Sequence, residues 1–211
     1  MSLTETTSQL FDAIVAGKAA PALELAKTAI DEGAEPGFLI EHCMTPAMEE
    51  VGRRFEIGEA FVPELLMAAQ AMKKSLELLK PLLGSSAISS GRIILGTVRG
   101  DLHDIGKNLV ASMLEGCGFE VINLGTDVDS DKFINAVREY SPKILGMSAL
   151  LTTTMPYMKE VIDALSLAGL RDKVRIMVGG APVSEDFAKS IGADGYSANA
   201  NTAVTLARSL V

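Results

Sequence analysis

Residues 92–116, RIILGTVRGDLHDIGKNLVASMLEG, decide the fold of this chain. They begin with an apolar, β-branched run, 92–98, that is typical of a buried strand. They continue into a segment, 105–117, whose apolar residues recur at helical spacing, and the polar loop between the two holds His103 between two aspartates. A strand that passes through a short loop into a helix is the first half of a βαβ unit, so this stretch predicts a parallel sheet.

The same alternation of strand and helix patterns continues to the last residues. The predicted strands are 92–98, 119–125, 144–150, 174–180 and 195–198, and the predicted helices are 105–117, 130–140, 154–169, 184–191 and 201–210. This pattern predicts an α/β domain, a flavodoxin-like (Rossmann-like) five-stranded parallel sheet with strand order 2-1-3-4-5. Ligands of such sheets bind beyond the carboxyl ends of the first and third strands.

The first part of the chain has helical periodicity throughout. The predicted helices are 7–17, 21–33, 36–59 and 61–83, which suggests a small four-helix-bundle cap domain. Pro46 lies inside the third of them and should kink or split it. The small, polar segment GSSAISSG is the best linker, so we expect a helical cap at 1–83, a linker at 84–91 and an α/β domain at 92–211.

Composition restricts the partners and the compartment. The 211 residues carry a net charge of −8, and an acidic chain is poorly suited to neutralise phosphates, so we expect no nucleic-acid partner. Cys43 and Cys117 lie far apart, which favours a reducing compartment over a disulfide framework. The first residues do not resemble a signal peptide and no apolar run is long enough for a membrane span, so we expect a cytoplasmic protein that does not bind membranes.

A nucleotide is the first ligand to consider for such a sheet. A dinucleotide site needs G-x-G-x-x-G after the first strand, but Gly96, Gly100 and Gly106 have a different spacing. A flavin mononucleotide fits better, because SALLTTT (148–154) offers hydroxyls near a helix start. Neither ligand explains a histidine between two acids.

A metal or a metal-containing cofactor would explain it. A histidine that binds a metal usually donates its second ring N–H to a carboxylate, and Asp101 can reach His103 if the chain between them is extended. One histidine is too few for a zinc or iron site built from protein ligands, so the cofactor would bring most of its own ligands, as a tetrapyrrole does. From residue types alone, an ordinary histidine in a loop or in the core remains an alternative.

Three linked motifs resemble those of a known family. The chain has D-x-H-x-x-G at 101–106, S-x-L at 148–150 and G-G at 179–180. This series, with its gaps of 107–147 and 151–178, resembles the cobalamin module of methionine synthase and the small corrinoid proteins of anaerobic methyl transfer. The helical first part is similar to the cap that precedes this module, so the resemblance covers nearly the whole chain.

The resemblance implies roles for individual residues. His103 would be the lower axial ligand of the cobalt in a cobalamin or related corrinoid, in place of the cofactor's own nucleotide base. Asp101 would accept the other imidazole N–H, and the hydroxyl of Thr154 would complete a relay. Gly106 would let the displaced nucleotide tail pass close to the backbone, and Phe61 matches an aromatic residue that covers the upper face of the corrin.

Other residues are implied as neighbours of the cofactor. They are Asp104, Ser148, Leu150, Thr152, Gly179, Gly180, Tyr196 and Asn199. Ordinary structural roles also remain open at this point: the hydroxyls of Ser148 and Thr154 could cap helices, the glycine pair could be a strand-end turn, and Phe61 could belong to the core.

The resemblance also implies a function, that of a corrinoid methyl carrier in anaerobic metabolism. A substrate-specific methyltransferase would place a methyl group on the cobalt, and a corrinoid:acceptor methyltransferase would remove it, as in methanogenesis or acetogenesis from methylamines, methanol, betaines or methoxy-aryl compounds. A reductive activation protein is a third expected partner, and the chain alone is not expected to turn over a substrate. The alternative is a cobalamin-binding sensor or storage protein, although the light-sensing regulators with such a cap carry a Trp before the Glu-His pair and this chain has no Trp.

Overall fold

The computed structural model describes residues 2–86 and 91–211. The chain divides into a helical unit, Met1–Ser89 with Glu115–Gly118, and a sheet unit, Ser90–Leu114 with Phe119–Val211. Half of the predicted linker, 84–91, lies outside the described residues, because 87–90 are not among them. The predicted domain boundaries therefore stay predictions.

The sheet unit is built on five parallel strands in the order β2-β1-β3-β4-β5, as the sequence predicts. The strands are β1 (Arg92–Thr97), β2 (Glu120–Asn123), β3 (Ile144–Ser148), β4 (Arg175–Gly179) and β5 (Gly195–Ser197). Because β1 lies between β2 and β3, the chain leaves β1 toward one side and β3 toward the other, which opens a space at their carboxyl ends.

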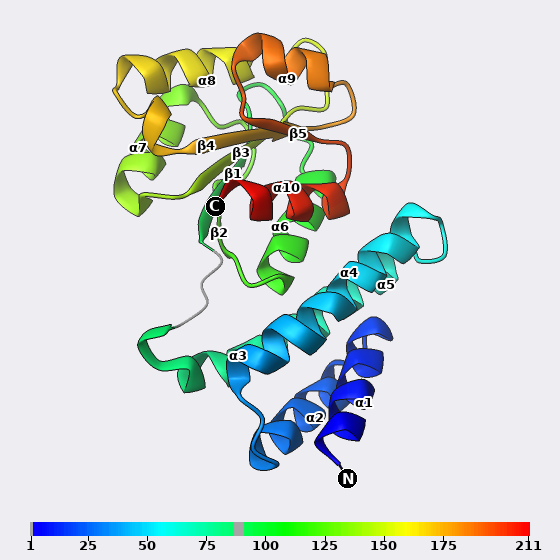
Figure 1. Cartoon of the computed structure of the whole chain (residues 1–211). Coiled ribbons are helices and arrows are strands. Elements are labelled where there is room, and N and C mark those ends of the chain that lie inside the picture. Colours follow the sequence, from blue (N-terminus) through cyan, green and yellow to red (C-terminus); the bar gives the residue numbers. More distant parts are fainter. Residues whose placement is uncertain (1, 87–90) are drawn as a thin grey trace. The chain divides into compact units, whose positions relative to one another are not determined.

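Helices cover both faces of this sheet (Figure 1). Each lies close to its predicted range: α6 (Ile105–Gly116), α7 (Ser130–Tyr140), α8 (Pro156–Leu167), α9 (Glu185–Ile191) and α10 (Ala200–Leu210), with a short 3₁₀ turn at Arg171–Lys173. α7, α8 and α9 pack on one face, and α10 and the start of α6 lie on the other. This is the flavodoxin-like arrangement that the alternation of patterns predicts.

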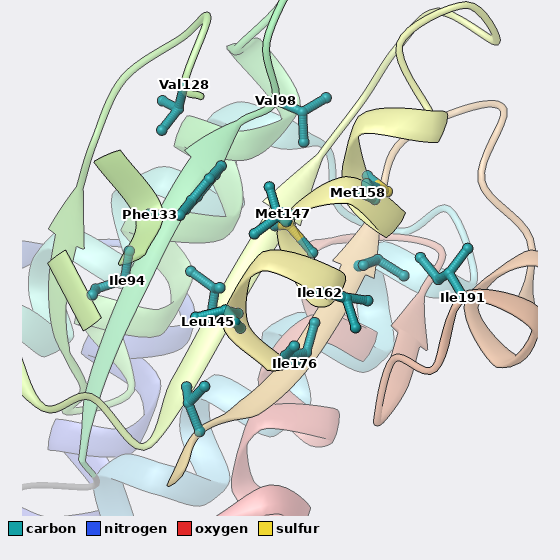
Figure 2. Packing of buried hydrophobic residues seen from close by; sticks show 14 of the residues in the cluster. Ile94, Val98, Val128, Phe133, Leu145, Met147, Met158, Ile162, Ile176 and Ile191 are labelled. Atoms are coloured by element: carbon teal, nitrogen blue, oxygen red, sulfur yellow. The ribbon is translucent and has the colours of Figure 1, made fainter. Parts of the chain in front are cut away.

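Alternating strand residues form the core beneath α7, α8 and α9 (Figure 2). Ile94, Leu145 and Ile176 point to this side and are fully buried. They belong to one buried cluster with the ring of Phe133 from α7. Gly96 makes room for that ring, because a Cβ there would lie 2.7 Å from two of its atoms. This packing fixes the strands whose ends carry the candidate site.

In the helical unit, the third predicted helix, 36–59, is divided close to Pro46, as the sequence predicts. The helices of this unit are α1 (Leu3–Val15), α2 (Ala19–Asp31), α3 (Pro36–Leu39), α4 (Thr45–Glu56) and α5 (Val62–Leu79), and a 3₁₀ turn follows at Lys80–Ser86. A π-helical turn, Ile40–Met44, joins α3 to α4, and Pro46 sits in the first turn of α4. Pro46 has no N–H to donate, and the N–H of Thr45 reaches back five residues to the carbonyl of Ile40.

Two further features bear on the expected compartment. Cys43 and Cys117 are both buried and are not joined in a disulfide, and burial raises the pKa of Cys43 to about 11 despite a hydrogen bond to the backbone. Within residues 2–86 and 91–211, no helix combines the length and the apolar character needed to cross a membrane.

Candidate functional site

The loop that follows β1 carries the candidate site. It runs from Val98 to the start of α6 at Ile105, at the carboxyl end of the sheet. β1 and β3 pair in a register that sets Thr97 opposite Ser148, so the loop after β1 and the turn after β3 begin side by side. The Asp101 loop and the turn at 149–155 therefore meet, as the switch-point argument predicts.

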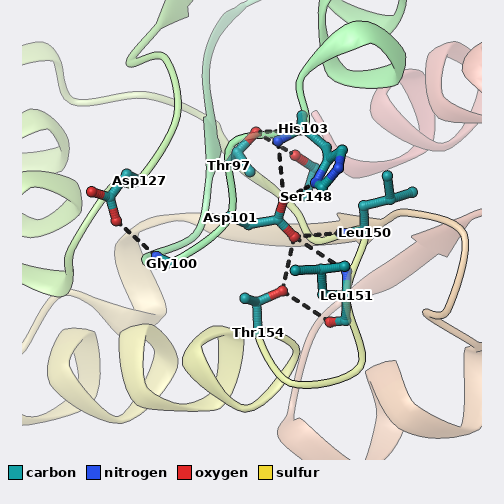
Figure 3. A network of polar contacts seen from close by, with 9 residues as sticks. All are labelled: Thr97, Gly100, Asp101, His103, Asp127, Ser148, Leu150, Leu151 and Thr154. Atoms are coloured by element: carbon teal, nitrogen blue, oxygen red, sulfur yellow. Dashed lines mark hydrogen bonds and ion pairs between the residues drawn. The ribbon is translucent and has the colours of Figure 1, made fainter.

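Asp101 is the centre of the contacts between these two segments (Figure 3). Its side chain is fully buried, and five donors surround the carboxylate. Oδ1 accepts from the backbone N–H of His103 at 3.0 Å and lies 2.8 Å from Nδ1 of the same residue. Oδ2 accepts from the N–H groups of Leu150 (2.7 Å) and Leu151 (3.2 Å) and from the hydroxyl of Thr154 (2.8 Å).

These donors set the charge of Asp101. Burial alone would raise the pKa of the carboxyl group, because the charged form loses its hydration. The backbone N–H groups of His103 and Leu150 act against this, and so do the His103 ring and the Thr154 hydroxyl. Together they hold the pKa of Asp101 well below its ordinary value, so the group is a carboxylate at neutral pH.

The charge of Asp101 in turn fixes the tautomer of His103. A carboxylate can only accept hydrogen bonds, so Nδ1 of the imidazole must carry the proton that points at it. Nε2 is then left with a free lone pair, and the side chain is 54% exposed. His103 thus offers one oriented nitrogen toward solvent, which is the arrangement expected of a metal ligand.

Exposed apolar side chains lie close to His103 along the chain. Leu102 and Ile105, on either side of His103 in sequence, are 72% and 88% exposed, and Leu150, whose N–H contacts Asp101, is also exposed. Large aliphatic side chains this exposed lose favourable burial energy, and several of them together beside one histidine indicate a ligand with an apolar face.

Two parts of the site were not predicted from the sequence. Thr97 lies 2.9 Å from Ser148, hydroxyl to hydroxyl, and 3.2 Å from the carbonyl oxygen of His103. Ser148 thus contacts the His103 loop only indirectly, through the hydroxyl of Thr97, and it does not cap a helix. The signal that could have revealed this is a hydroxyl at the end of each of two strands predicted to be neighbours.

The second missed part is a buried lysine on α6. Nζ of Lys107 donates to the side-chain oxygens of Asn108 (2.9 Å) and Asn123 (2.6 Å), which ties the first turn of α6 to the end of β2. Burial lowers the pKa of Lys107, and nearby Asp104 opposes that shift. The sequence signal that could have indicated a buried lysine is the position of Lys107 on the same helix face as the apolar residues Ala111 and Leu114.

The structure gives the three motif glycines different surroundings. A Cβ added to Gly106 would meet no described atom within 4 Å, so the protein itself leaves space there. A Cβ on Gly179 would lie 3.0 Å from the carbonyl oxygen of Ser197, and one on Gly180 would overlap the carbonyl of Ala149. Gly180 also has φ +128°, which only glycine adopts readily. The glycine pair is thus required by the packing of the strand ends, and its role toward a ligand stays a prediction.

The remaining predicted residues lie outside the Asp101 network. Asp104 accepts from Asn108 (2.8 Å), and Thr152 is exposed in the turn after β3. Tyr196 on β5 packs against the core, and Asn199 caps α10. Phe61 immediately precedes α5 in the helical unit, where its backbone N–H donates to Glu64, and it is 65% exposed, so it does not belong to the core.

Family models match both units of the chain. A B12 binding domain model matches residues 91–205, and a second model of the same description matches residues 7–80. In the described part of the chain, no group of three or more His, Cys, Asp or Glu side chains could hold a metal ion.

Full-length relatives are similar throughout. The chain is 45% identical over 213 residues to a dimethylamine corrinoid protein of Methanosarcina barkeri, covering 100% of both chains. It is 42% identical over 213 residues to trimethylamine corrinoid protein 1 of Methanosarcina acetivorans, covering 100% of this chain and 99% of the relative.

Solved structures are similar in sequence and in fold. A cobalamin-binding protein from Desulfitobacterium hafniense has a TM-score of 0.82 and 33% identity, with 100% of this chain and 99% of that chain covered. The methanol:cobalamin methyltransferase complex MtaBC from Methanosarcina barkeri contains a chain with a TM-score of 0.83 and 33% identity, with 98% and 79% covered.

The charge on Asp101 predicts a pH-dependent stability. A carboxyl group whose pKa is lowered by folding stabilises the native state above its unfolded pKa of about 4, and this contribution is lost as the pH falls below that value. Asp101→Asn should therefore lower the free energy of unfolding at pH 7, by about 1–3 kcal/mol, because an amide N–H₂ faces donors. The difference from wild type should shrink as the pH falls below about 4.

Urea titrations followed by tyrosine fluorescence can measure this, because Tyr140, Tyr157 and Tyr196, the three tyrosines of the chain, all lie in the sheet unit. Asp163→Asn is the control, since Asp163 is exposed on α8 and pairs only with Lys159 on the surface. A difference between wild type and Asp101→Asn that stayed constant down to about pH 3 would contradict the assignment of charge.

Proposed function

The chain belongs to the family of B12-binding proteins, and on this premise we propose that it is a corrinoid methyl carrier that works between two methyltransferases. The observation that carries the proposal is the single oriented nitrogen of His103, whose partner Asp101 is fully buried and charged. That arrangement would supply one protein ligand to the cobalt of a corrinoid, which brings its corrin ring nitrogens as further ligands.

The residues around His103 fit a corrinoid. Nε2 points to the surface, the exposed side chains of Leu102 and Ile105 can cover an apolar ring face, and Gly106 leaves space where a Cβ would otherwise stand. We propose Gly106 and the ends of β3, β4 and β5 as the place of the nucleotide tail. Phe61 is proposed as the residue that covers the upper face.

When bound, the corrinoid supplies a cobalt atom that can carry a methyl group between enzymes. The chain's own residues hold the lower ligand. Asp101 keeps the proton on Nδ1 of His103, so Nε2 presents a lone pair without a change of tautomer. Thr154 donates to the other oxygen of that carboxylate and prevents it from rotating away from the imidazole. The described residues thus orient a ligand.

The relatives suggest the partners. Two relatives are named as corrinoid proteins of dimethylamine and trimethylamine, and one of the two similar structures is the methanol:cobalamin methyltransferase complex MtaBC. We propose a methylamine-specific methyltransferase as the donor enzyme of this chain, a corrinoid:acceptor methyltransferase as the receiver, and a reductive activation protein as a third partner. These names favour a methyl carrier over a cobalamin sensor or store. The cytoplasmic location belongs to the same proposal.

The exposed apolar residues beside His103 provide a test of corrinoid binding. Ile105→Ser should leave the stability of the free protein within about 0.5 kcal/mol of wild type, since Ile105 is already exposed. The same change should weaken cobalamin binding about 10- to 150-fold, because an aliphatic side chain that becomes buried contributes on the order of 1.5–3 kcal/mol.

Binding is measured by titration with cobalamin under visible absorption. Leu167→Ser is the matched control, because Leu167 is 92% exposed at the end of α8 and should affect neither stability nor binding. Equal cobalamin affinity in the Ile105 and Leu167 variants would argue against a corrinoid on this surface.

The methyl-carrier function is tested with the donor enzymes. The cobalamin-loaded and reduced protein should not consume dimethylamine or trimethylamine alone, because in this proposal the donor methyltransferase binds and activates the amine. Addition of a dimethylamine- or trimethylamine-specific methyltransferase should release the demethylated amine in proportion to the corrinoid protein present. Chromatography of the amines gives the result; demethylation by the isolated protein, or none with either enzyme, would refute the proposal.

A further inference from the structure

The loop between β2 and α7 contains a residue with unusual backbone geometry. Asp127 has φ +52°, and in the described part of the chain only one other non-glycine residue, Ser141, has a positive φ. Ser141 ends α7, where a left-handed residue is common. Asp127 ends no helix, so its conformation needs another explanation.

A bulge in the pairing between this loop and β1 explains the geometry. The N–H of Thr97 donates to the carbonyl of Gly125 (3.0 Å). In a regular parallel ladder the N–H two residues further along, that of Asp127, would then donate to the carbonyl of Thr97. Instead Val128 donates to it, at 2.9 Å. Counted from the Thr97–Gly125 bond, one extra residue is inserted, and counted from the regular Leu124–Leu95 bond, two are. Bulges recur beside functional sites, where they redirect a group.

The redirected groups of Asp127 hold the Asp101 loop. Its N–H donates to the carbonyl oxygen of Asp101 at 3.0 Å, and its Oδ1 accepts from the N–H of Gly100 at 2.7 Å (Figure 3). These two bonds hold the peptide group between residues 99 and 100 and the peptide group between residues 101 and 102. The backbone that carries the buried carboxylate is thus fixed at both ends.

We propose that Asp127 is a positioning residue for His103. Asp101 Oδ1 contacts both the backbone N–H and the Nδ1 atom of His103, so a small movement of the Asp101 backbone misaligns the pair. Asp127 is exposed and acts on the imidazole only through Gly100 and Asp101. The inference rests on the proposed role of His103 as the cobalt ligand and adds the element that sets its orientation.

The test uses the full-length protein without corrinoid. Asp127→Gly removes the side-chain acceptor but accepts the positive φ, so the turn can still form. Asp127→Asn keeps a carbonyl oxygen for Gly100 and also tolerates this φ, so it should rescue the wild-type behaviour. Asp129→Ala is the matched control, since it removes the cap of α7 in the same loop and leaves Gly100 and Asp101 untouched.

The readout is the tautomer of His103. Long-range ¹H–¹⁵N spectra of histidine-labelled protein at about pH 9, above the ordinary histidine pKa of about 6.5, distinguish the Nδ1–H from the Nε2–H form. His42, the other histidine of the chain, is assigned with a His42→Gln variant. A purely structural role of Asp127 would lower the melting temperature without moving this tautomer.

We expect the Nδ1–H form to dominate in wild type, Asp127→Asn and Asp129→Ala, and to lose that dominance in Asp127→Gly. Cobalamin binding by Asp127→Gly should weaken up to about 10-fold, the low end for residues that orient a ligating histidine. An unchanged tautomer in Asp127→Gly would overturn this inference alone. A wild-type protein without a dominant Nδ1–H form would overturn the Asp101–His103 arrangement, and with it the proposed function.

Discussion

The carboxylate of Asp101 is fully buried, and a protein tolerates a buried charge only where hydrogen bonds replace its lost hydration. Five donors do so here, from His103, Leu150, Leu151 and Thr154. One of these donors is the imidazole itself. The cost of burying the charge is therefore offset by the same contacts that choose the tautomer of His103, so stability and ligand geometry depend on one group.

The topology of the sheet brings the donors of this carboxylate together. These donors come from the loop after β1 and from the turn after β3, and both must end at the same edge. The parallel pairing of β1 with β3, with Thr97 opposite Ser148, provides that edge. The bulge at Asp127 then connects the loop after β2 to the same place. Three segments far apart in sequence thus orient one imidazole.

The sequence predicts the fold well because strand and helix periods are strong and the connections are short. The proximity of Asp101 and Thr154 could be expected from motif spacing together with strand order. The parts that Thr97 and Lys107 play leave only indirect signals in the sequence, because their contacts depend on strand register and on the depth of a lysine side chain. The part that Asp127 plays leaves none, because it depends on a bulge. The resemblance explains the two consecutive glycines, Gly179 and Gly180, by a ligand that they would line. In the structure, their close packing against Ser197 and Ala149 is by itself a sufficient reason for glycine at both positions.

The central claim is that a histidine nitrogen of this chain, and not the cofactor's own base, is the lower ligand of the cobalt. Electron paramagnetic resonance of the cobalt(II) form tests it most directly, with ¹⁵N-histidine in the protein and unlabelled cobalamin. A ¹⁵N ligand splits each cobalt line into a doublet, whereas the ¹⁴N of the cofactor's base gives a triplet. We predict a doublet that persists in His42→Gln, the variant that leaves His103 as the only histidine. A triplet would mean that the cofactor keeps its own base and would contradict the account.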